Sequence, residues 1–493
     1  MTETALLALD QGTTSSRAIV FDLSGRAVAT AQQEFAQIYP QPGWVEHDPE
    51  VIWATTLTTA RKAIELAAAK GYQIACAGLA NQRETVVVWE RETGRPIHNA
   101  IVWQDRRTAR RCAQLKQDGA EARVASRTGL VLDPYFSGAK IAWILDHVDG
   151  ARARAEAGAL CAGTIDSFLI HRLTQGRLHV TDATNASRTA LYDITARSWD
   201  ADLLELFNVP EAVLPEVRDC DALGAAAPAS VLGQALRLEG AAGDQQAAMI
   251  GQACLQPGEM KSTYGTGAFM LVNTGEAPVF SENRLLTTIA WRAQGRTIYA
   301  LEGSVLSAGA TVQWLRDGLG LIAKSSEIES LARAADPRAA VYLVPAFAGL
   351  GAPWWAPDAR GLITGLTRDS GRAELARAAL DSTVYQTADL LDAMAADGAD
   401  VSRLRVDGGM TVNNSLMQRL ADLSNSEVVR PVNTETTAWG AAFLGGLGAG
   451  VYSSLDEAAA LWRADRRFSP AMDPTERKAQ LTGWRKAVER TLA

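Results

Sequence analysis

Two predicted β-hairpins, about half a chain apart, constrain the fold of this sequence most strongly. The first, LALDQGTTSSRAIVFD (residues 7–22), places an acid, a glycine, four hydroxyl side chains and an arginine between two apolar strands. The second, MKSTYGTGAFMLVN (residues 260–273), again places a turn, here Gly-Thr-Gly, between two apolar runs. Two halves that each begin with such a hairpin predict two similar domains facing a shared cleft, with GQACLQPGE (residues 251–259) as the joint.

Strands and helices alternate after the first hairpin. In the segment 48–71, Asp48 is placed as an N-cap, Pro49 occupies the first helical position and Gly71 follows the end, so this segment predicts a helix. QIACAGLA and TVVVWE then predict strands, and the alternation indicates an α/β sheet. The chain end predicts two more helices, the last with an apolar face that extends to Leu492.

Charge and cysteine content argue against several classes of partner. The 493 residues carry a formal net charge of −8, so we expect neither nucleic acid nor an anionic membrane as partner. Five scattered cysteines without a CxxC pair indicate reduced thiols in a cytoplasmic protein, not a disulfide framework or a zinc site. The start of the chain lacks a basic segment, so no signal peptide is expected. The apolar run Ala438–Tyr452 is shorter than the roughly 20 residues of a membrane span and predicts a tightly packed helix.

The first hairpin turn contains the groups that a nucleoside triphosphate requires. Its glycine lets backbone N–H groups approach phosphate closely, and Thr13, Thr14 and Ser15 add hydroxyl donors. Arg17 adds positive charge, whereas Asp10 repels phosphate but can hold a Mg²⁺ ion that bridges to it. An ordinary hairpin turn is the alternative at this point, since the sequence has neither a Walker loop nor a dinucleotide fingerprint here.

Two further glycine turns favour the phosphate interpretation. Thr266 lies between two glycines in the second hairpin. Gly408 and Gly409 separate a predicted strand from a predicted helix, where a nucleotide can lie on backbone amides. Asn413 and Asn414 follow after three further residues and are placed for polar contacts.

Together with these turns, several longer segments resemble the FGGY carbohydrate kinases, and among them the members that phosphorylate glycerol. The similarity runs from end to end and includes QPGWVEHDP, ANQRET, IVWQDRRT and GAAGDQQAAM, as well as both family signatures, YFSGAKIAWILDH (135–147) and GLITGLTRDSGRAELARAALD (361–381). The resemblance implies an α/β fold of two actin-like ATPase (ribonuclease H-like) domains flanking a nucleotide and substrate cleft. We place an N-terminal domain at 1–251, a C-terminal domain at 252–450 and a helical extension at 451–493.

The resemblance also implies the reaction and its residues. The implied reaction is phosphoryl transfer from ATP, with Mg²⁺, to glycerol, giving sn-glycerol 3-phosphate, the entry step of glycerol catabolism. Hydroxyl groups both donate and accept, which matches a set of acidic, basic and amide side chains. The implied glycerol contacts are Arg83, Glu84, Trp103, Tyr135, Asp244, Gln245 and Phe269. The implied ATP contacts are Thr13, Thr14, Ser15, Arg17, Thr266, Gly309, Gln313, Gly409 and Asn413.

Asp244 is the predicted catalytic base, because it would accept the proton of the attacking hydroxyl. Arg17 and Asp10 are the other predicted catalytic groups, and Asp10 and Asp244 are the predicted metal ligands. Phosphoryl transfer depends mainly on positioning and on neutralising charge at the phosphate oxygens. Closure of the two domains would exclude water, which otherwise competes as acceptor.

Two alternatives stay open at this point. The nearest is another FGGY kinase, acting on xylulose, ribulose, gluconate or a small polyol such as dihydroxyacetone. The other is a nucleotide-driven switch on the same fold, in which Arg83, Glu84 and Tyr135 would have no purpose. The family analogy indicates a homodimer or homotetramer. The stretch VLGQALRLEGAAGDQQ lacks the Gly-Gly-Thr-Arg-Ile loop of members inhibited by fructose 1,6-bisphosphate, so we do not expect that inhibition.

Overall fold

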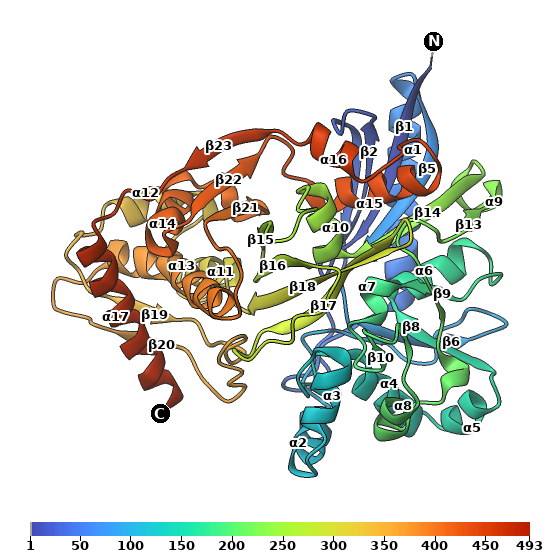
Figure 1. Ribbon diagram of the computed structural model, residues 1–493, viewed down its shortest axis with the longest axis horizontal. Helices are drawn as coiled ribbons and strands as arrows, with labels where there is room; N and C mark the ends of the chain where they lie inside the picture. Colours follow the sequence, from blue (N-terminus) through green and yellow to red (C-terminus); the bar gives the residue numbers. More distant parts are fainter. Residues whose placement is uncertain (1) are drawn as a thin grey trace.

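The computed structural model describes residues 2–493, so Met1, where the proposed N-terminal domain begins, lies outside the described residues. Two lobes lie side by side, each built around one large β-sheet (Figure 1). The expected α/β architecture is therefore confirmed.

The sheet of the first lobe has the strand order β13-β14-β5-β1-β2-β3. Strands β1 and β2 pair antiparallel, as the first hairpin predicts, whereas β1, β5 and β14 run parallel. Parallel strands end at one edge of a sheet, so Asp10 on β1, Asn81 on β5 and Gly243 on β14 lie close together there. The strands are β1 (Glu3–Gln11), β2 (Ser15–Asp22), β3 (Ala27–Glu34), β5 (Tyr72–Asn81), β13 (Ala225–Ala227) and β14 (Leu236–Gly243).

Helix α1 (Pro49–Ala69) packs against this sheet and begins and ends where the sequence predicts. The Asp48 carboxylate accepts a hydrogen bond from the Glu50 N–H, and Pro49 occupies the first turn. Gly71 follows the last turn with a φ of +83°, a conformation that glycine adopts without strain.

A smaller sheet with the order β4-β7-β6-β8 and a set of helices shorter than α1 complete the first lobe. Its strands are β4 (Glu46–His47), β6 (Val86–Glu90), β7 (Ala100–Ile101) and β8 (Leu160–Thr164), and two short pairs add β9 (Val180–Asp182), β10 (Tyr192–Asp193), β11 (Ser198–Trp199) and β12 (Glu216–Arg218). The helices are α2 (Ala109–Gln117), α3 (Glu121–Thr128), α4 (Ser137–His147), α5 (Ala151–Glu156), α6 (Ile165–Leu173), α7 (Ala183–Ala186), α8 (Ala201–Phe207) and α9 (Ala229–Leu232).

The sheet of the second lobe has the order β17-β18-β16-β15-β21-β22-β23. Strands β15 and β16 form the second predicted hairpin, and β15 runs parallel to β21. The strands are β15 (Met260–Tyr264), β16 (Ala268–Gly275), β17 (Leu286–Ala293), β18 (Arg296–Val305), β21 (Arg403–Asp407), β22 (Glu427–Pro431) and β23 (Ala464–Phe468), with a separate pair β19 (Tyr342–Val344) and β20 (Leu362–Thr364). The helices of this lobe are α11 (Gly309–Asp317), α12 (Ile328–Arg333), α13 (Arg372–Ala396), α14 (Asn414–Ser424) and α17 (Pro474–Leu492), and α16 (Asp456–Leu461) precedes β23.

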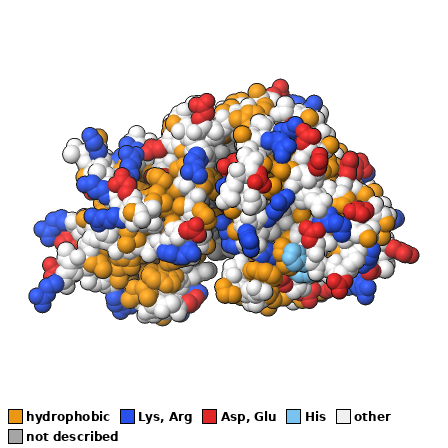
Figure 2. Space-filling model, turned by 90° about the horizontal axis from the view of Figure 1, so that it is seen from below, with side chains coloured by type: hydrophobic (Ala, Val, Ile, Leu, Met, Phe, Trp, Pro, Cys, Tyr) orange, Lys and Arg blue, Asp and Glu red, His pale blue; other side chains and the backbone are white. Residues whose placement is uncertain are grey.

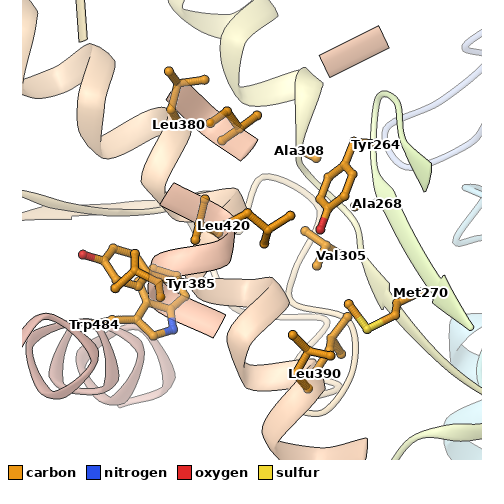
Figure 3. Close-up of a cluster of buried hydrophobic side chains, with 14 of the residues drawn as sticks. Tyr264, Ala268, Met270, Val305, Ala308, Leu380, Tyr385, Leu390, Leu420 and Trp484 are labelled. Carbon is orange, nitrogen blue, oxygen red and sulfur yellow. The ribbon is translucent and has the colours of Figure 1, made fainter. Parts of the chain in front are cut away.

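The core of the second lobe anchors the C-terminal helix α17. Trp484 of α17 stacks on Tyr385 of α13, with ring centroids 5.3 Å apart (Figure 3). Asp473 caps the helix through the N–H groups of Thr475 and Glu476. The prediction that the apolar face of this helix extends to Leu492 is wrong, because Leu492 lies beyond the packed core and is 44% exposed.

Helix α15 (Thr436–Gly448) connects the lobes: in sequence it lies between strands β22 and β23 of the second sheet, but it packs on β5, β14 and α10 (Asp244–Gly251). Glycines make this approach possible. A Cβ on Gly440 would lie 1.8 Å from the carbonyl oxygen of Ala247, and one on Gly78 would lie 1.7 Å from that of Ala441. The tightly packed helix expected from Ala438–Tyr452 is confirmed. Within residues 2–493, no helix combines the length and apolar character needed to cross a membrane.

Candidate active site

A cavity of about 430 Å³ lies between the two hairpin turns. The space-filling view shows the molecule hollowed between its two lobes (Figure 2). The structure brings together the seven side chains predicted to contact glycerol, and all of them line this cavity: Arg83, Glu84, Trp103, Tyr135, Asp244, Gln245 and Phe269. Four of the predicted ATP contacts line the same cavity, namely Thr13, Thr14, Thr266 and Gln313.

The sheet topology explains this assembly. Arg83 and Glu84 follow the end of β5, and Asp244 follows the end of the parallel strand β14 as the first residue of α10. Trp103 comes just after β7, and Tyr135 just before α4. Side chains from four separate chain segments of the first lobe therefore converge with Phe269 of β16 in the second lobe.

Asp244 is held in place by its neighbours. Its Oδ1 accepts the Gln245 backbone N–H at 2.7 Å and lies 3.3 Å from Arg83 Nε, while its Oδ2 accepts the Gln245 side-chain amide at 3.2 Å. Burial raises the pKa of Asp244, and the positive charges of Arg83 and Lys261 oppose that rise. A carboxylate with a raised pKa is a stronger proton acceptor, which suits a general base.

The aromatic side chains form a wall that also contacts the first turn. The Trp103 ring meets Tyr135 and Phe269 edge to face, with centroids 5.8 and 6.0 Å apart. Trp103 Nε1 donates to Thr13 Oγ1 at 2.9 Å, so the Thr13 hydroxyl keeps its own O–H for another acceptor. Burial raises the pKa of Tyr135 well above its ordinary value, so its hydroxyl stays protonated and can donate.

The second hairpin turn is docked on helix α11. The Gly309 N–H donates to the Gly265 carbonyl at 3.0 Å, and a Cβ on Gly309 would lie 2.6 Å from that oxygen. Packing alone therefore requires glycine at position 309, which does not line the cavity. Gln313, one turn further along α11, does line it.

The third glycine turn follows β21, as predicted. Gly408 adopts a φ of +91°. The space beside Gly409 is open: a Cβ added to this residue would have no neighbouring atom of the described residues 2–493 within 4 Å. Asn413 caps α14: its Oδ1 accepts the Leu416 N–H at 2.9 Å, which leaves its NH₂ group as a donor.

Arg17, Ser15 and Asp10 lie away from the cavity lining. Arg17 forms ion pairs with Asp10 at 2.6 Å and with Glu435 at 2.8 Å, so two carboxylates balance its charge. Ser15 Oγ accepts from Gln32 at 3.0 Å. A direct phosphate contact of Arg17 or Ser15 stays a prediction.

The surroundings of Asp10 fit a magnesium ion held mainly by a nucleotide. Both hydrogen bonds from Arg17 reach Asp10 Oδ2, which leaves Oδ1 as the oxygen available to an ion or its water. Among residues 2–493, no group of three or more His, Cys, Asp or Glu forms a complete metal site. Mg²⁺ often binds through one or two carboxylates together with substrate phosphates and waters, so the donor set at Asp10 is compatible with it.

Sequence reasoning missed two buried lysines. Lys140 of α4 has no exposed surface, and its ammonium group donates to the carbonyls of Glu84 at 3.1 Å, Val102 at 3.4 Å and Tyr135 at 2.7 Å. It thus joins three segments that line the cavity, and burial lowers its pKa to about 8. Lys261 of β15 donates to the Gln245 side-chain carbonyl at 2.5 Å, and burial lowers its pKa to about 8 as well. For Lys140 the signal available was a single charge inside the apolar stretch GAKIAWIL, whereas the polar strand MKSTY carries no such signal for Lys261.

Two buried charged residues were missed as well. Glu302 of β18 pairs with Arg83, and Arg188, just after α7, pairs with Glu84. Neither residue lines the cavity, and each is more than 100 positions from its partner. Nothing local in the sequence marks such distant pairs.

Comparison with known proteins agrees with this architecture. Models described as the N-terminal and C-terminal domains of the FGGY family of carbohydrate kinases match residues 5–251 and 260–449. A protein of Allorhizobium ampelinum named glycerol kinase is 59% identical over 490 residues, covering 99% of both chains. A glycerol kinase of Rhodospirillum centenum is also 59% identical, covering 99% of this chain and 98% of its own.

Solved structures agree as well. A Plasmodium falciparum glycerol kinase with ADP superimposes with a TM-score of 0.91 at 36% identity, covering 100% of this chain and 99% of its own. A xylulose kinase of Lactobacillus acidophilus shares the fold with a TM-score of 0.85 at 21% identity, covering 99% of this chain and 97% of its own. The predicted fold of two actin-like ATPase domains is thereby confirmed. The chain belongs to the FGGY family of carbohydrate kinases.

Proposed function

We propose that this protein transfers the γ-phosphoryl group of ATP to glycerol, giving ADP and sn-glycerol 3-phosphate. The observation that carries the proposal is the cavity itself: seven side chains suited to a small triol surround it, next to two glycine turns suited to phosphate. Full-length relatives named glycerol kinase at 59% identity support the choice of glycerol. The solved glycerol kinase with ADP supports nucleotide binding in the same fold.

In the proposed mechanism, Glu84 and Asp244 accept hydrogen bonds from glycerol hydroxyls and Arg83 donates one. Asp244 takes the proton of the attacking primary hydroxyl while that oxygen forms its bond to the γ-phosphorus and the bond to the ADP oxygen breaks. The aromatic wall of Trp103, Tyr135 and Phe269 covers the C–H groups of the triol and excludes water, the competing acceptor.

The phosphate groups are assigned to the backbone amides and hydroxyls of both turns, with Thr13, Thr14 and Thr266 nearest the cavity. Mg²⁺ bound with ATP would neutralise charge on the phosphates, and Asp10 Oδ1, with Asp244, would hold it or its waters. Gln313, Gly409 and Asn413 are assigned to the rest of the nucleotide.

The remaining proposals concern organisation and regulation. We propose domains at 1–251 and 252–450 with an extension at 451–493, a cytoplasmic location, and a homodimer or homotetramer. Inhibition by fructose 1,6-bisphosphate is not expected. Arg237, the arginine within the stretch VLGQALRLEGAAGDQQ, is already paired with Glu239 at 2.8 Å.

The test is ADP release by the purified protein with ATP and Mg²⁺ over a panel of glycerol, dihydroxyacetone, xylulose, ribulose and gluconate. We expect the highest kcat/KM on glycerol, with a product that sn-glycerol 3-phosphate dehydrogenase oxidises. Turnover on a pentulose without turnover on glycerol would overturn the proposal.

A further inference from the structure

Four buried charges join the two lobes directly behind the proposed glycerol site. Arg83 and Glu84 reach the cavity, whereas Arg188 and Glu302 lie behind them. All four are at most 3% exposed. Glu302 comes from β18 of the second lobe, and the other three come from the first lobe.

The four side chains alternate in sign and are linked by short hydrogen bonds. Arg83 binds Glu302 with both terminal nitrogens, at 2.5 and 3.1 Å. Arg188 Nε donates to Glu84 Oε1 at 2.6 Å, and Arg188 Nη2 donates to Glu302 Oε1 at 2.9 Å. Arg188 and Glu302 thus bind each other, and each also holds one of the two residues that face the cavity.

This arrangement determines the side-chain orientations of Arg83 and Glu84 at the cavity. Because Glu302 binds the terminal nitrogens of Arg83, the Nε of Arg83 stays directed at Asp244, 3.3 Å away. Glu84 adopts a φ of +60°, a strained conformation for a residue with a side chain, so its orientation needs support from outside its own backbone. Arg188 supplies that support to the carboxylate, leaving its other oxygen for a ligand.

The charge balance of the cluster also depends on both lobes. Burial alone would raise the pKa of Glu302, but Arg188 and Arg83 hold it below its ordinary value, so Glu302 stays ionised. Without Glu302, the cluster of four would keep two buried arginines and only one carboxylate, that of Glu84. The cluster is neutral only when β18 of the second lobe lies against the first.

We propose that Arg188 and Glu302 are positioning residues of the glycerol site, and that Glu302 couples the geometry of that site to the placement of the second lobe. Neither residue touches glycerol in this proposal: Arg188 orients Glu84, and Glu302 orients Arg83. The inference rests on the proposed function, because it assigns glycerol to Arg83 and Glu84.

The test uses Glu302→Gln, Arg188→Met and the double variant, with kinetics measured separately for glycerol and ATP. The glycerol KM should rise about ten- to a hundredfold in each single variant, the equivalent of one charged hydrogen bond, while the ATP KM changes by less than about twofold. The double variant removes one charge of each sign, so its unfolding temperature should recover toward that of the parent. Its glycerol KM should stay raised, because Arg83 and Glu84 are still unsupported.

Asp381→Asn is the matched control. It breaks another largely buried ion pair, to Arg419 at 2.6 Å, in the second lobe and outside the cavity. We expect a lower unfolding temperature with an unchanged glycerol KM, which separates loss of stability from loss of positioning.

A glycerol KM within about threefold of the parent in the folded single variants overturns the inference. If a single variant shows no cooperative unfolding transition and is therefore not folded, the charge-balanced double variant is used instead. A glycerol KM of the double variant within about threefold of the parent then overturns the inference. A parent protein without glycerol turnover would instead refute the proposed function, so the two failures are distinguishable.

Discussion

Replacing Asp244 by asparagine tests the proposed catalytic base most directly. The asparagine Oδ1 can keep the 2.7 Å hydrogen bond from the Gln245 N–H, but its NH₂ group then faces the Gln245 side-chain amide, another donor. Gln245 cannot rotate freely, because Lys261 holds its carbonyl at 2.5 Å. This local mismatch costs about 1 kcal/mol, whereas loss of a general base costs about 10²–10⁴ in rate, or roughly 3–5 kcal/mol. We therefore expect kcat to fall by at least about a hundredfold with little change in the ATP KM.

The pH dependence of kcat/KM supplies a second measurement. Asp244 must be unprotonated to accept the proton, and burial raises its pKa above the ordinary value of 3.8. Activity of the parent should therefore decline as the pH falls through that raised pKa. Arg83, Lys261 and Glu84 are the charged groups facing Asp244, and the two cations keep the pKa from rising further. In Asp244→Asn this acidic limb should disappear.

Asp221→Asn is the matched control for this prediction. Burial also raises the pKa of Asp221, yet this residue does not line the cavity. Its replacement should leave kcat and the acidic limb unchanged. Near-normal turnover of Asp244→Asn, or an acidic limb that survives in it, would refute the assignment of the base.

Three further changes test other parts of the site and fold. Glu84→Ala should raise the glycerol KM and leave the ATP KM unchanged in steady-state kinetics; an unchanged glycerol KM would contradict its role. Lys140→Met removes the donor to three buried carbonyls, and each carbonyl left without a hydrogen bond costs about 1–3 kcal/mol of stability. Part of this loss is offset because the variant no longer buries a charge, so the unfolding temperature should fall and the glycerol KM should rise. A glycerol KM equal to that of the parent would exclude a link between Lys140 and the site. Gly440→Ala places a Cβ 1.8 Å from a carbonyl oxygen, so it should lower the free energy of unfolding, measured with denaturant, by about 3 kcal/mol or more. The control Gly361→Ala adds a Cβ that makes only ordinary van der Waals contacts, so it should leave the free energy of unfolding nearly unchanged. Equal stability of the two glycine variants would show that α15 shifts without cost.

Much of the local structure could be predicted from the sequence because its causes are local. Hairpins at both glycine turns, the capped helix α1 and the strand–turn–helix at Gly408 depend on residues within a few positions of one another. The seven cavity side chains were reached by resemblance, and their approach in space agrees with it. The exposure of Leu492 at the end of α17 could not be predicted, because it depends on how far the core of the second lobe extends.

The sequence by itself determined the turns, their order and the residue types that face phosphate and a polyol, because glycine conformations and hydrogen-bonding groups are properties of short segments. Only the tertiary structure decided which charges those residues meet. Arg83 and Glu302 are 219 positions apart, and their pairing exists because the tertiary structure brings β18 of the second lobe next to the segment that follows β5. In the same way, Arg17, besides its local partner Asp10, pairs with Glu435, the residue just before α15. Electrostatic partners across lobes follow from the meeting of surfaces, which no local pattern encodes.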